Sequence, residues 1–180
     1  MPTEGFHNPA SVLDQIGIAE GMVVADLGCG SGEIAMAMAR RVGPNGFVNA
    51  LDVLPTAIES VQAKIDSEHL ENIHGQRVDL ERSNGTKLSD KSQNLVYLGN
   101  VLWQTGKKQE VIREAARIAV SGGTVAAVEW NPGTGGFGPP AESRVSEESL
   151  QKLMSDAGLT VERVFPTGSY HYGLVAKKNA

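Results

Sequence analysis

The chain has 180 residues, of which 41% are hydrophobic and 21% charged, with a formal net charge of −5. This length suits a single domain with a substantial core, and we expect residues 1–180 to form one. The acidic balance argues against a nucleic-acid-binding domain, because such domains usually carry a basic face. A single cysteine, Cys29, excludes an internal disulfide framework and suits a reducing compartment.

The first residues show no targeting pattern. Residues 1–6 lack the basic and then apolar segments of a secretion signal, and no apolar run approaches the roughly 18 residues of a membrane span. We therefore expect a cytoplasmic protein with no membrane span. Residues 1–7 also lack periodicity, so we expect them either to be flexible or to fold over a bound ligand.

The chain begins its regular structure with a helix. Asn8 is suited to cap this helix, Pro9 to occupy its first position, and Gly17 to end it. An apolar run then predicts a buried strand over residues 22–27. A helix rich in alanine and methionine follows and runs to about Val42.

Three alternating glycines, Gly28, Gly30 and Gly32, connect this strand to this helix. Glycine permits positive φ and lets a ligand approach the backbone closely. The helix N-terminus behind the turn presents free N–H groups. The pattern is typical of a nucleotide-binding turn.

The residue after the third glycine indicates which nucleotide binds. A G-x-G-x-x-G fingerprint would place a pyrophosphate on the helix N-terminus, but Glu33 occupies its sixth position, which requires a small residue. A carboxylate there also repels a pyrophosphate. Acids at Asp26 and Glu33 favour a cationic ligand without phosphate, and S-adenosylmethionine (SAM) is such a ligand.

The next two predicted strands each end in an acid. Residues 47–51 form an apolar run before Asp52, and residues 73–78 form another before Asp79. Between them, Pro55 is suited to begin a helix whose apolar residues recur at 3- to 4-residue spacing.

A fourth strand over residues 95–98 precedes Gly99 and Asn100, and a helix is predicted over 107–120. Ser121-Gly122-Gly123 is expected to end that helix, and residues 124–128 to form the fifth strand. Such alternation predicts βαβ units, with helices on both faces of a parallel sheet.

The last part of the chain breaks this rhythm. Residues 131–140 are rich in glycine and proline and are expected to form either a lid or a mobile surface loop. Ser146 is suited to cap a helix that ends at Gly158. Residues 159–165 and 170–176 predict an antiparallel hairpin.

At this point two segments resemble a known family. Residues 24–32 (VADLGCGSG) look like the first motif of class I SAM-dependent methyltransferases. Residues 117–129 (RIAVSGGTVAAVE) resemble the helix-to-fifth-strand segment of the ubiquinone/menaquinone-biosynthesis-like branch (methyltransferase type 11/25-like), with Val120-Ser121 where that branch usually has Lys-Pro. The resemblance covers about residues 8–180.

The resemblance implies an α/β, Rossmann-like fold with a seven-stranded sheet of order 3-2-1-4-5-7-6 and a C-terminal antiparallel hairpin. It also implies methyl transfer from SAM (EC 2.1.1.-), with S-adenosylhomocysteine as the product. It says little about the acceptor, because this branch methylates many unrelated small molecules.

Cofactor contacts follow from strand-end spacing and from the resemblance. Asp52, about twenty residues beyond the turn, is suited to accept both ribose hydroxyls; the alternative is an acid that only ends the strand or caps the helix. The resemblance assigns Asp79 to the adenine amino group, against the alternative of a solvated loop acid. Asp26 is expected to anchor either the glycine turn or the methionine ammonium. The full predicted set is Asp26, Gly28, Cys29, Gly30, Gly32, Asp52, Val53, Asp79, Leu80 and Asn100.

Within that set, Val53 and Leu80 are the expected apolar neighbours of adenine. Cys29 is interpreted as a small loop residue and not as a nucleophile, because no histidine is close in sequence. Asn100 is expected to face the sulfonium and the acceptor. The segment from Gly99 to Trp103 lacks the Asn/Asp-Pro-Pro-Tyr signature of nucleic-acid amino-methylating enzymes, so the predicted acceptor is a small molecule.

Methyl transfer requires mainly alignment and exclusion of water, and a base only if the acceptor must lose a proton. Candidate bases are Glu129, Tyr170, His171 and Tyr172. His171 has the most suitable pKa, although a histidine hydrogen-bonded in or beside the sheet is at least an equal alternative. Tyr170 and Tyr172 alternate onto one face of the predicted strand, and their alternative place is in the core.

Trp103, Trp130 and Phe137 are either walls of an acceptor pocket or core residues. His7, His69 and His74 do not cluster at ligand spacing, so no metal is predicted. Three functions compete: a small-molecule methyltransferase, a non-catalytic SAM-binding protein, and, with less support, an NAD(P)-dependent oxidoreductase. The acceptor atom, the use of a base and the oligomeric state stay open.

Overall fold

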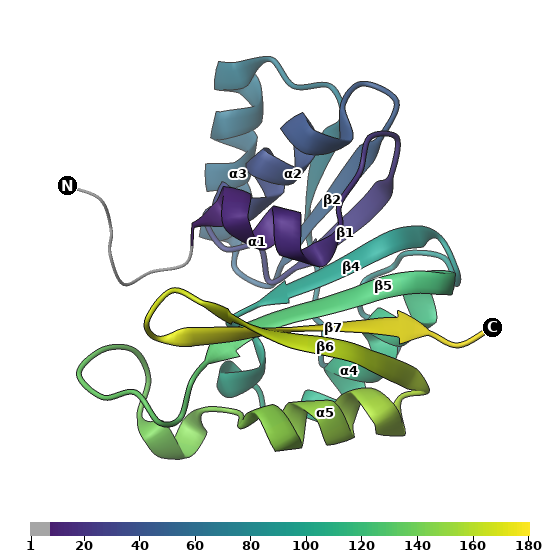
Figure 1. The fold of residues 1–180 in the computed structure, drawn as a ribbon. Coiled ribbons are helices and arrows are strands. Elements are labelled where there is room, and N and C mark those ends of the chain that lie inside the picture. Colours follow the sequence, from purple (N-terminus) through teal and green to yellow (C-terminus); the bar gives the residue numbers. More distant parts are fainter. Residues whose placement is uncertain (1–7) are drawn as a thin grey trace.

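A computed structural model describes residues 8–180 and shows one seven-stranded sheet with helices on both faces (Figure 1). The strand order is β3-β2-β1-β4-β5-β7-β6, as predicted. The strands are β1 (Val23–Leu27), β2 (Phe47–Asp52), β3 (Ile73–Arg77), β4 (Gln93–Gly99), β5 (Ala119–Trp130), β6 (Leu159–Thr167) and β7 (His171–Lys178). The helices are α1 (Pro9–Ile16), α2 (Glu33–Val42), α3 (Pro55–Glu68), η1 (Leu102–Gln104), α4 (Lys108–Ile118), η2 (Ala141–Ser143) and α5 (Glu147–Asp156).

The first five strands are parallel, and β7 runs antiparallel between β5 and β6. Helices α1, α2 and α3 cover one face of the sheet, and α4 and α5 cover the other (Figure 1). Each face therefore has its own cluster of buried apolar side chains. The central strands are buried on both faces, which explains why they are continuous apolar runs in the sequence.

Local sequence chemistry sets the helix ends. The Asn8 side chain accepts a hydrogen bond from the N–H of Ala10 at 2.9 Å, and the Ser146 side chain accepts one from the N–H of Ser149 at 3.2 Å. Both caps were predicted, since these side chains satisfy N–H groups that have no partner in the first helical turn.

One predicted boundary was wrong. Helix α4 ends at Ile118, and the chain enters β5 directly at Ala119, so Ser121-Gly122-Gly123 lies inside the strand. Ala119 pairs with Gln93 and Thr124 pairs with Leu95, and the intervening residues form an irregularity in which Gly122 has a φ of 73°. The glycines therefore accommodate a bulge instead of ending a helix.

The hairpin also differs from its predicted limits. Strand β6 continues through Pro166 to Thr167, and Tyr170 lies in the turn before β7. The prediction that Tyr170 and Tyr172 share a strand is therefore wrong. Of the two, Tyr172 belongs to the core.

The carboxyl ends of the five parallel strands lie on one side of the molecule, at the left of Figure 1. The 131–140 loop and the turn between β6 and β7 lie on this same side. Ligands of open α/β sheets bind at the carboxyl ends of the strands, so this is the side where a site is expected. From residue 8 to residue 180, no helix is long and apolar enough to cross a membrane.

Candidate functional site

The glycine turn between β1 and α2 has a left-handed backbone at all three glycines, with φ of 76°, 53° and 86° at Gly28, Gly30 and Gly32. The N–H of Gly28 donates to the Leu51 carbonyl at 2.7 Å, and the N–H of Gly30 donates to Asp52 Oδ2 at 2.9 Å. The turn is thus held by the end of β2. Asp26, one expected anchor of these N–H groups, does not bind them.

Two of the glycines are required by close packing, whereas at Gly30 no described residue fills the Cβ position. A Cβ on Gly28 would lie 2.4 Å from Val101 Cγ2, and a Cβ on Gly32 would lie 2.8 Å from Val61 Cγ2. A Cβ on Gly30 would meet no atom of residues 8–180 within 4 Å. The backbone at Gly30 therefore leaves room for a ligand to approach.

Asp26, near the end of β1, is a buried acid with an oxygen that lacks a partner. Its side chain is 2% exposed, and Oδ2 has no hydrogen-bond partner among the described residues. Burial raises the pKa of Asp26 to about 7, and the nearby charge of Asp52 acts in the same direction. Such a carboxylate is stabilised by a cation or by hydrogen-bond donors.

Asn100 supplies a second such acceptor at the end of β4. Its backbone is left-handed, with a φ of 57°, and its N–H donates to the Val128 carbonyl at 2.8 Å. Asn100 Oδ1 is buried without a hydrogen-bond partner in the described part of the chain. Because β1 and β4 are neighbours, the structure brings two unpartnered acceptors to adjacent strand ends.

Asp52 connects the turn to the next helix. Besides binding Gly30, its carboxylate accepts the N–H of Leu54 at 2.9 Å, and the side chain is 8% exposed. The strand-end role considered for Asp52 is therefore real. Two carboxylate oxygens have about four acceptor positions, so room remains for the predicted ribose hydroxyls.

Val53 and Asp79 line one cavity of about 480 Å³ at the ends of β2 and β3. Val53 is 50% exposed in this cavity. Leu80, the residue that follows Asp79, is buried. The Asp79 carboxylate accepts hydrogen bonds from the N–H of Glu81 and from Arg82 Nε, at 3.1 and 2.9 Å. The carboxylate therefore binds groups of its own loop, which agrees with the alternative interpretation of Asp79 as a loop acid.

Glu33 has a local partner. Its carboxylate forms an ion pair with Lys64 on α3, and its side chain is 72% exposed. The charge that was expected to favour a cationic ligand is therefore partly compensated, and Asp26 is the stronger argument for such a ligand. The carboxylate still occupies the first turn of α2, where a pyrophosphate would have to rest.

Cys29 is buried, and burial raises its pKa above the usual value of a thiol. A nucleophilic cysteine requires the opposite shift, because the thiolate is the reactive form. This agrees with its predicted place as a small residue of the turn.

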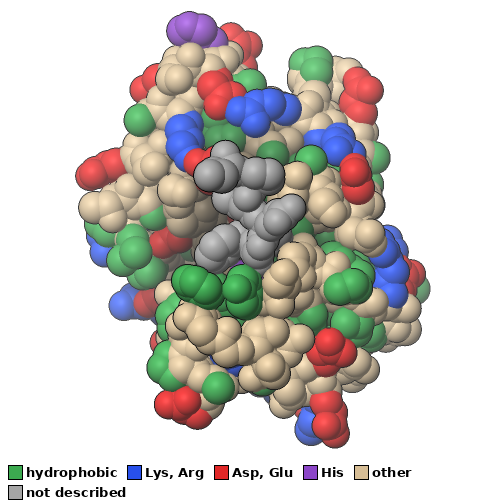
Figure 2. All heavy atoms as spheres, turned by 60° about the vertical axis from the view of Figure 1, so that its left-hand side comes forward, with side chains coloured by type: hydrophobic (Ala, Val, Ile, Leu, Met, Phe, Trp, Pro, Cys, Tyr) green, Lys and Arg blue, Asp and Glu red, His purple; other side chains and the backbone are tan. Residues whose placement is uncertain are grey.

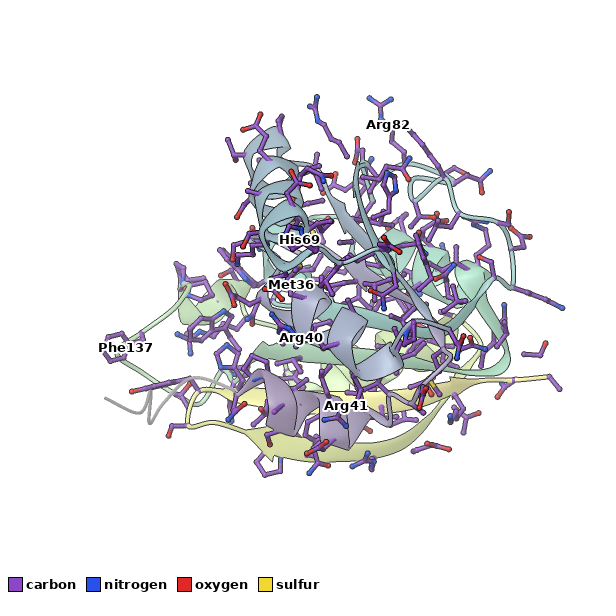
Figure 3. All side chains as sticks on the ribbon, turned by 90° about the horizontal axis from the view of Figure 1, so that it is seen from above. Met36, Arg40, Arg41, His69, Arg82 and Phe137 are labelled. Atoms are coloured by element: carbon purple, nitrogen blue, oxygen red, sulfur yellow. The ribbon has the colours of Figure 1, made fainter. Side chains whose placement is uncertain are left out.

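Aromatic side chains gather where β5 ends and β7 begins. The rings of Trp130 and His171 lie 4.1 Å apart between centroids, and those of Phe137 and Tyr170 lie 5.5 Å apart, edge to face. Phe137 is 59% exposed, and Figure 3 shows it projecting from the outer part of its loop. Figure 2 turns this side of the molecule forward and shows hydrophobic side chains near the middle of the face, with charged ones around them.

The candidate bases differ in their surroundings. Tyr172 is buried, and its hydroxyl donates to the Val145 carbonyl at 2.8 Å, so it is a core residue. His171 is 4% exposed in its contact with Trp130, and Tyr170 is half-buried in the turn. Glu129 is fully buried, and burial raises its pKa to about 7 against the hydrogen bonds from the backbone of Leu102 and Val101.

Arg144 is a residue of this region that the sequence did not single out. Its guanidinium donates to the carbonyls of Asn131, Thr134, Phe137 and Pro139, and it lies 5.5 Å from the centroid of the Trp130 ring. Backbone carbonyls along the 131–140 loop thus bind a single guanidinium group. A lone arginine after a loop rich in glycine and proline is the only sequence signal of this arrangement.

No group of three or more potential metal-ligating side chains occurs between residues 8 and 180. His69 and His74 belong to that part of the chain, whereas His7 and the expectation for residues 1–7 lie outside the described residues.

The sheet order, the glycine turn at the end of β1 and the acid at the end of β2 define a class I SAM-dependent methyltransferase domain. A family model described as a methyltransferase domain matches residues 18–166, and the chain belongs to this family.

Individual relatives agree with this assignment. The chain is 28% identical over 125 residues to a demethylmenaquinone methyltransferase of Halalkalibacterium halodurans, a match that covers 68% of this chain and 49% of the relative. The chain therefore spans about half the length of this curated relative. A SAM-dependent methyltransferase from Aquifex aeolicus superposes with a TM-score of 0.88 at 26% identity, over 96% of this chain and 90% of that one.

The same fold is also found in a protein whose name describes a different activity. The cyclase SpnF superposes with a TM-score of 0.82 at 15% identity, over 96% of this chain and 80% of that one. This likeness concerns the fold alone, since one fold can carry several activities.

Proposed function

We propose that this chain transfers the methyl group of SAM to a small, largely apolar aromatic acceptor. The observation that carries the cofactor part is a pair of buried acceptors, Asp26 Oδ2 and Asn100 Oδ1, beside the glycine turn. Neither atom has a partner among residues 8–180, and none of these residues fills the space at Gly30. Buried polar atoms without partners in a folded protein require an explanation, and a cationic ligand supplies one.

The residues fit SAM part by part. Asp26 and Asn100 accept from the ammonium and face the sulfonium end, and the backbone of Gly28, Gly30 and Gly32 with Cys29 lies against the amino-acid tail. Asp52 accepts from the ribose hydroxyls. Val53 and Leu80 flank the adenine, and Asp79 accepts from its amino group after releasing Arg82. When bound, SAM supplies a methyl group already activated by positive sulfur.

The aromatic cluster supports the acceptor class. Both tryptophans of the chain lie at the carboxyl ends of β4 and β5, in a chain that is only 5% aromatic. Trp130, Phe137 and Tyr170 offer flat apolar surfaces to an aromatic ring. The name of the Halalkalibacterium relative, a demethylmenaquinone methyltransferase, also supports such an acceptor.

In this proposal the protein aligns the acceptor and excludes water, which are the main requirements of an in-line displacement. The 131–140 loop closes the acceptor side. If the acceptor loses a proton, His171 or Tyr170 receives it, because both lie at the aromatic cluster. The single free cysteine suits a cytoplasmic location.

The first test separates the cofactors. Calorimetric titration of the purified chain with SAM and with NADH is expected to give binding of SAM only, since Glu33 stands where a pyrophosphate would rest. Binding of NADH without SAM would overturn the proposal and favour an oxidoreductase.

The second test separates an enzyme from a SAM-binding protein. Incubation with methyl-labelled SAM and a metabolite extract is expected to label a small aromatic product. SAM binding with no labelled product, across extracts from several growth conditions, would favour the non-catalytic alternative.

A further inference from the structure

Glu129 is a buried carboxylate with an unusual pair of partners. It lies near the end of β5, and its side chain is 0% exposed. In the sheet its register partner is Tyr172 of the neighbouring strand β7. Glu129 Oε1 accepts the backbone N–H groups of Val101 and Leu102, at 3.0 and 2.8 Å, and Oε2 is buried without a partner among the described residues. These two residues follow the end of β4 at Gly99. A side chain of β5 therefore binds the backbone of the segment that comes after β4.

The hydrogen bonds have a clear physical basis. Residues 102–104 form the short helix η1, and its first N–H groups have no partner within the helix. A carboxylate that accepts the N–H groups of Val101 and Leu102 satisfies donors that this turn leaves without a partner. Glu129 therefore acts as an N-terminal cap, although it comes from a strand that is distant in sequence.

The held segment touches the cofactor turn. Val101 Cγ2 occupies the position that a Cβ on Gly28 would need, so Val101 packs directly on the backbone of this glycine. Asn100, one residue earlier, carries the unpartnered Oδ1 and the left-handed backbone. A shift of the segment would therefore move both Asn100 and the contact with Gly28.

We propose that Glu129 is a positioning residue of the cofactor site: its carboxylate sets the place of Asn100 and Val101 against the glycine turn. The inference rests on the proposed assignment of that turn and Asn100 to SAM. It differs from the base interpretation considered for Glu129, because here the carboxylate acts through backbone N–H groups and transfers no proton.

The test compares variants of the full chain. Glu129→Ala removes the acceptor, and Glu129→Asp withdraws it by about 1.5 Å, one carbon–carbon bond. Both are expected to weaken SAM binding by about tenfold or more in calorimetry, the loss that follows when buried N–H groups lose their acceptor. Glu129→Gln keeps an oxygen for both N–H groups and is expected to bind SAM within about threefold of the wild type.

Glu114 gives a matched control. It is another buried acid, 6% exposed, whose Oε1 accepts the N–H of Thr86 at 3.0 Å far along the chain from the turn. Glu114→Ala is expected to lower the unfolding temperature and leave SAM affinity unchanged. Hydrogen exchange adds a direct measurement: the amides of Val101 and Leu102 should exchange faster in Glu129→Asp and Glu129→Ala, and not in the Glu114 variant.

The outcomes are distinct. If the alanine variant does not fold, the comparison of Asp with Gln decides. Equal SAM affinity in all folded Glu129 variants would show a merely structural acid and overturn the inference. Normal SAM affinity in Glu129→Gln with loss of labelled-methyl transfer would also overturn it and indicate a proton acceptor. Absence of SAM binding in the wild type would instead refute the proposed function.

Discussion

Two buried acids at the site, Asp26 and Glu129, are stabilised in different ways. Glu129 Oε1 accepts two backbone N–H groups, although Glu129 Oε2, like Asp26 Oδ2, has no partner among the described residues. An unpartnered buried carboxylate is destabilising when it is ionised. At the residue scale, the ionised Asp26 carboxylate thus destabilises the free protein, and a bound cationic ligand would reduce this cost.

This strain predicts a pH dependence. Burial raises the pKa of Asp26 from 3.8 to about 7, so between these values the folded protein binds more protons than the unfolded chain. The free energy of unfolding therefore falls as the pH rises through this interval. In urea titrations of the free protein, Asp26→Asn is expected to remove about 2 kcal/mol of the decrease between pH 5 and pH 7.

The remaining decrease in that variant reports Glu129, whose pKa is also raised to about 7. Parallel curves for the wild type and Asp26→Asn would contradict the assignment of the shift to Asp26.

Asp52 gives a second prediction at the residue scale. It accepts the N–H of Gly30 and is proposed to accept the ribose hydroxyls. Asp52→Ala therefore removes a contact with the glycine turn and the proposed contacts with the cofactor. The expected loss of SAM binding free energy is about 1–3 kcal/mol, measured by calorimetry. Asp66→Ala, at an exposed position of α3, is the control and should bind SAM normally. Unchanged affinity in Asp52→Ala would refute the ribose assignment.

At the scale of elements, the 131–140 loop depends on Arg144. Four backbone carbonyls converge on its guanidinium, and no carboxylate of the described chain pairs with it in an ion pair. Arginine suits this place because its planar fork carries five N–H donors. The loop is thus ordered by one side chain despite its glycines and prolines.

Arg144→Ala is expected to release the loop and leave the rest of the sheet intact. Limited proteolysis should then cleave within residues 131–140 several times faster, and the fluorescence of Trp130 should change because the cation leaves its ring. Arg113→Ala, at an exposed position of α4, is the control. If proteolysis of the two variants matches, Arg144 does not order the loop.

The elements also show which features sequence can predict. Caps at Asn8 and Ser146 were predictable because a cap and its partner lie within a few residues. The bulge around Gly122 was not, because it depends on the register with β4. The contacts of Arg144 and Glu129 were not either, since their partners are backbone groups, which carry no residue identity in the sequence.

At the scale of the molecule, the cofactor turn is joined to both neighbours of β1. The end of β2 holds the turn through Leu51 and Asp52, and the segment after β4 packs on Gly28 through Val101. The two hydrophobic clusters lie on opposite faces of this one sheet. A ligand bound at the turn therefore contacts strands that are shared by both clusters.

This connection predicts that SAM stabilises the chain as one cooperative unit. At a SAM concentration 100 times its dissociation constant, binding adds about 2.7 kcal/mol to the free energy of unfolding. For a chain of this size that corresponds to a rise in the unfolding temperature of about 5–10 °C. Near-ultraviolet circular dichroism, which reports the tryptophans beside the site, and far-ultraviolet circular dichroism, which reports the whole sheet, should shift together. A rise seen only in the near-ultraviolet would mean that SAM orders the site locally and that the sheet does not transmit its binding.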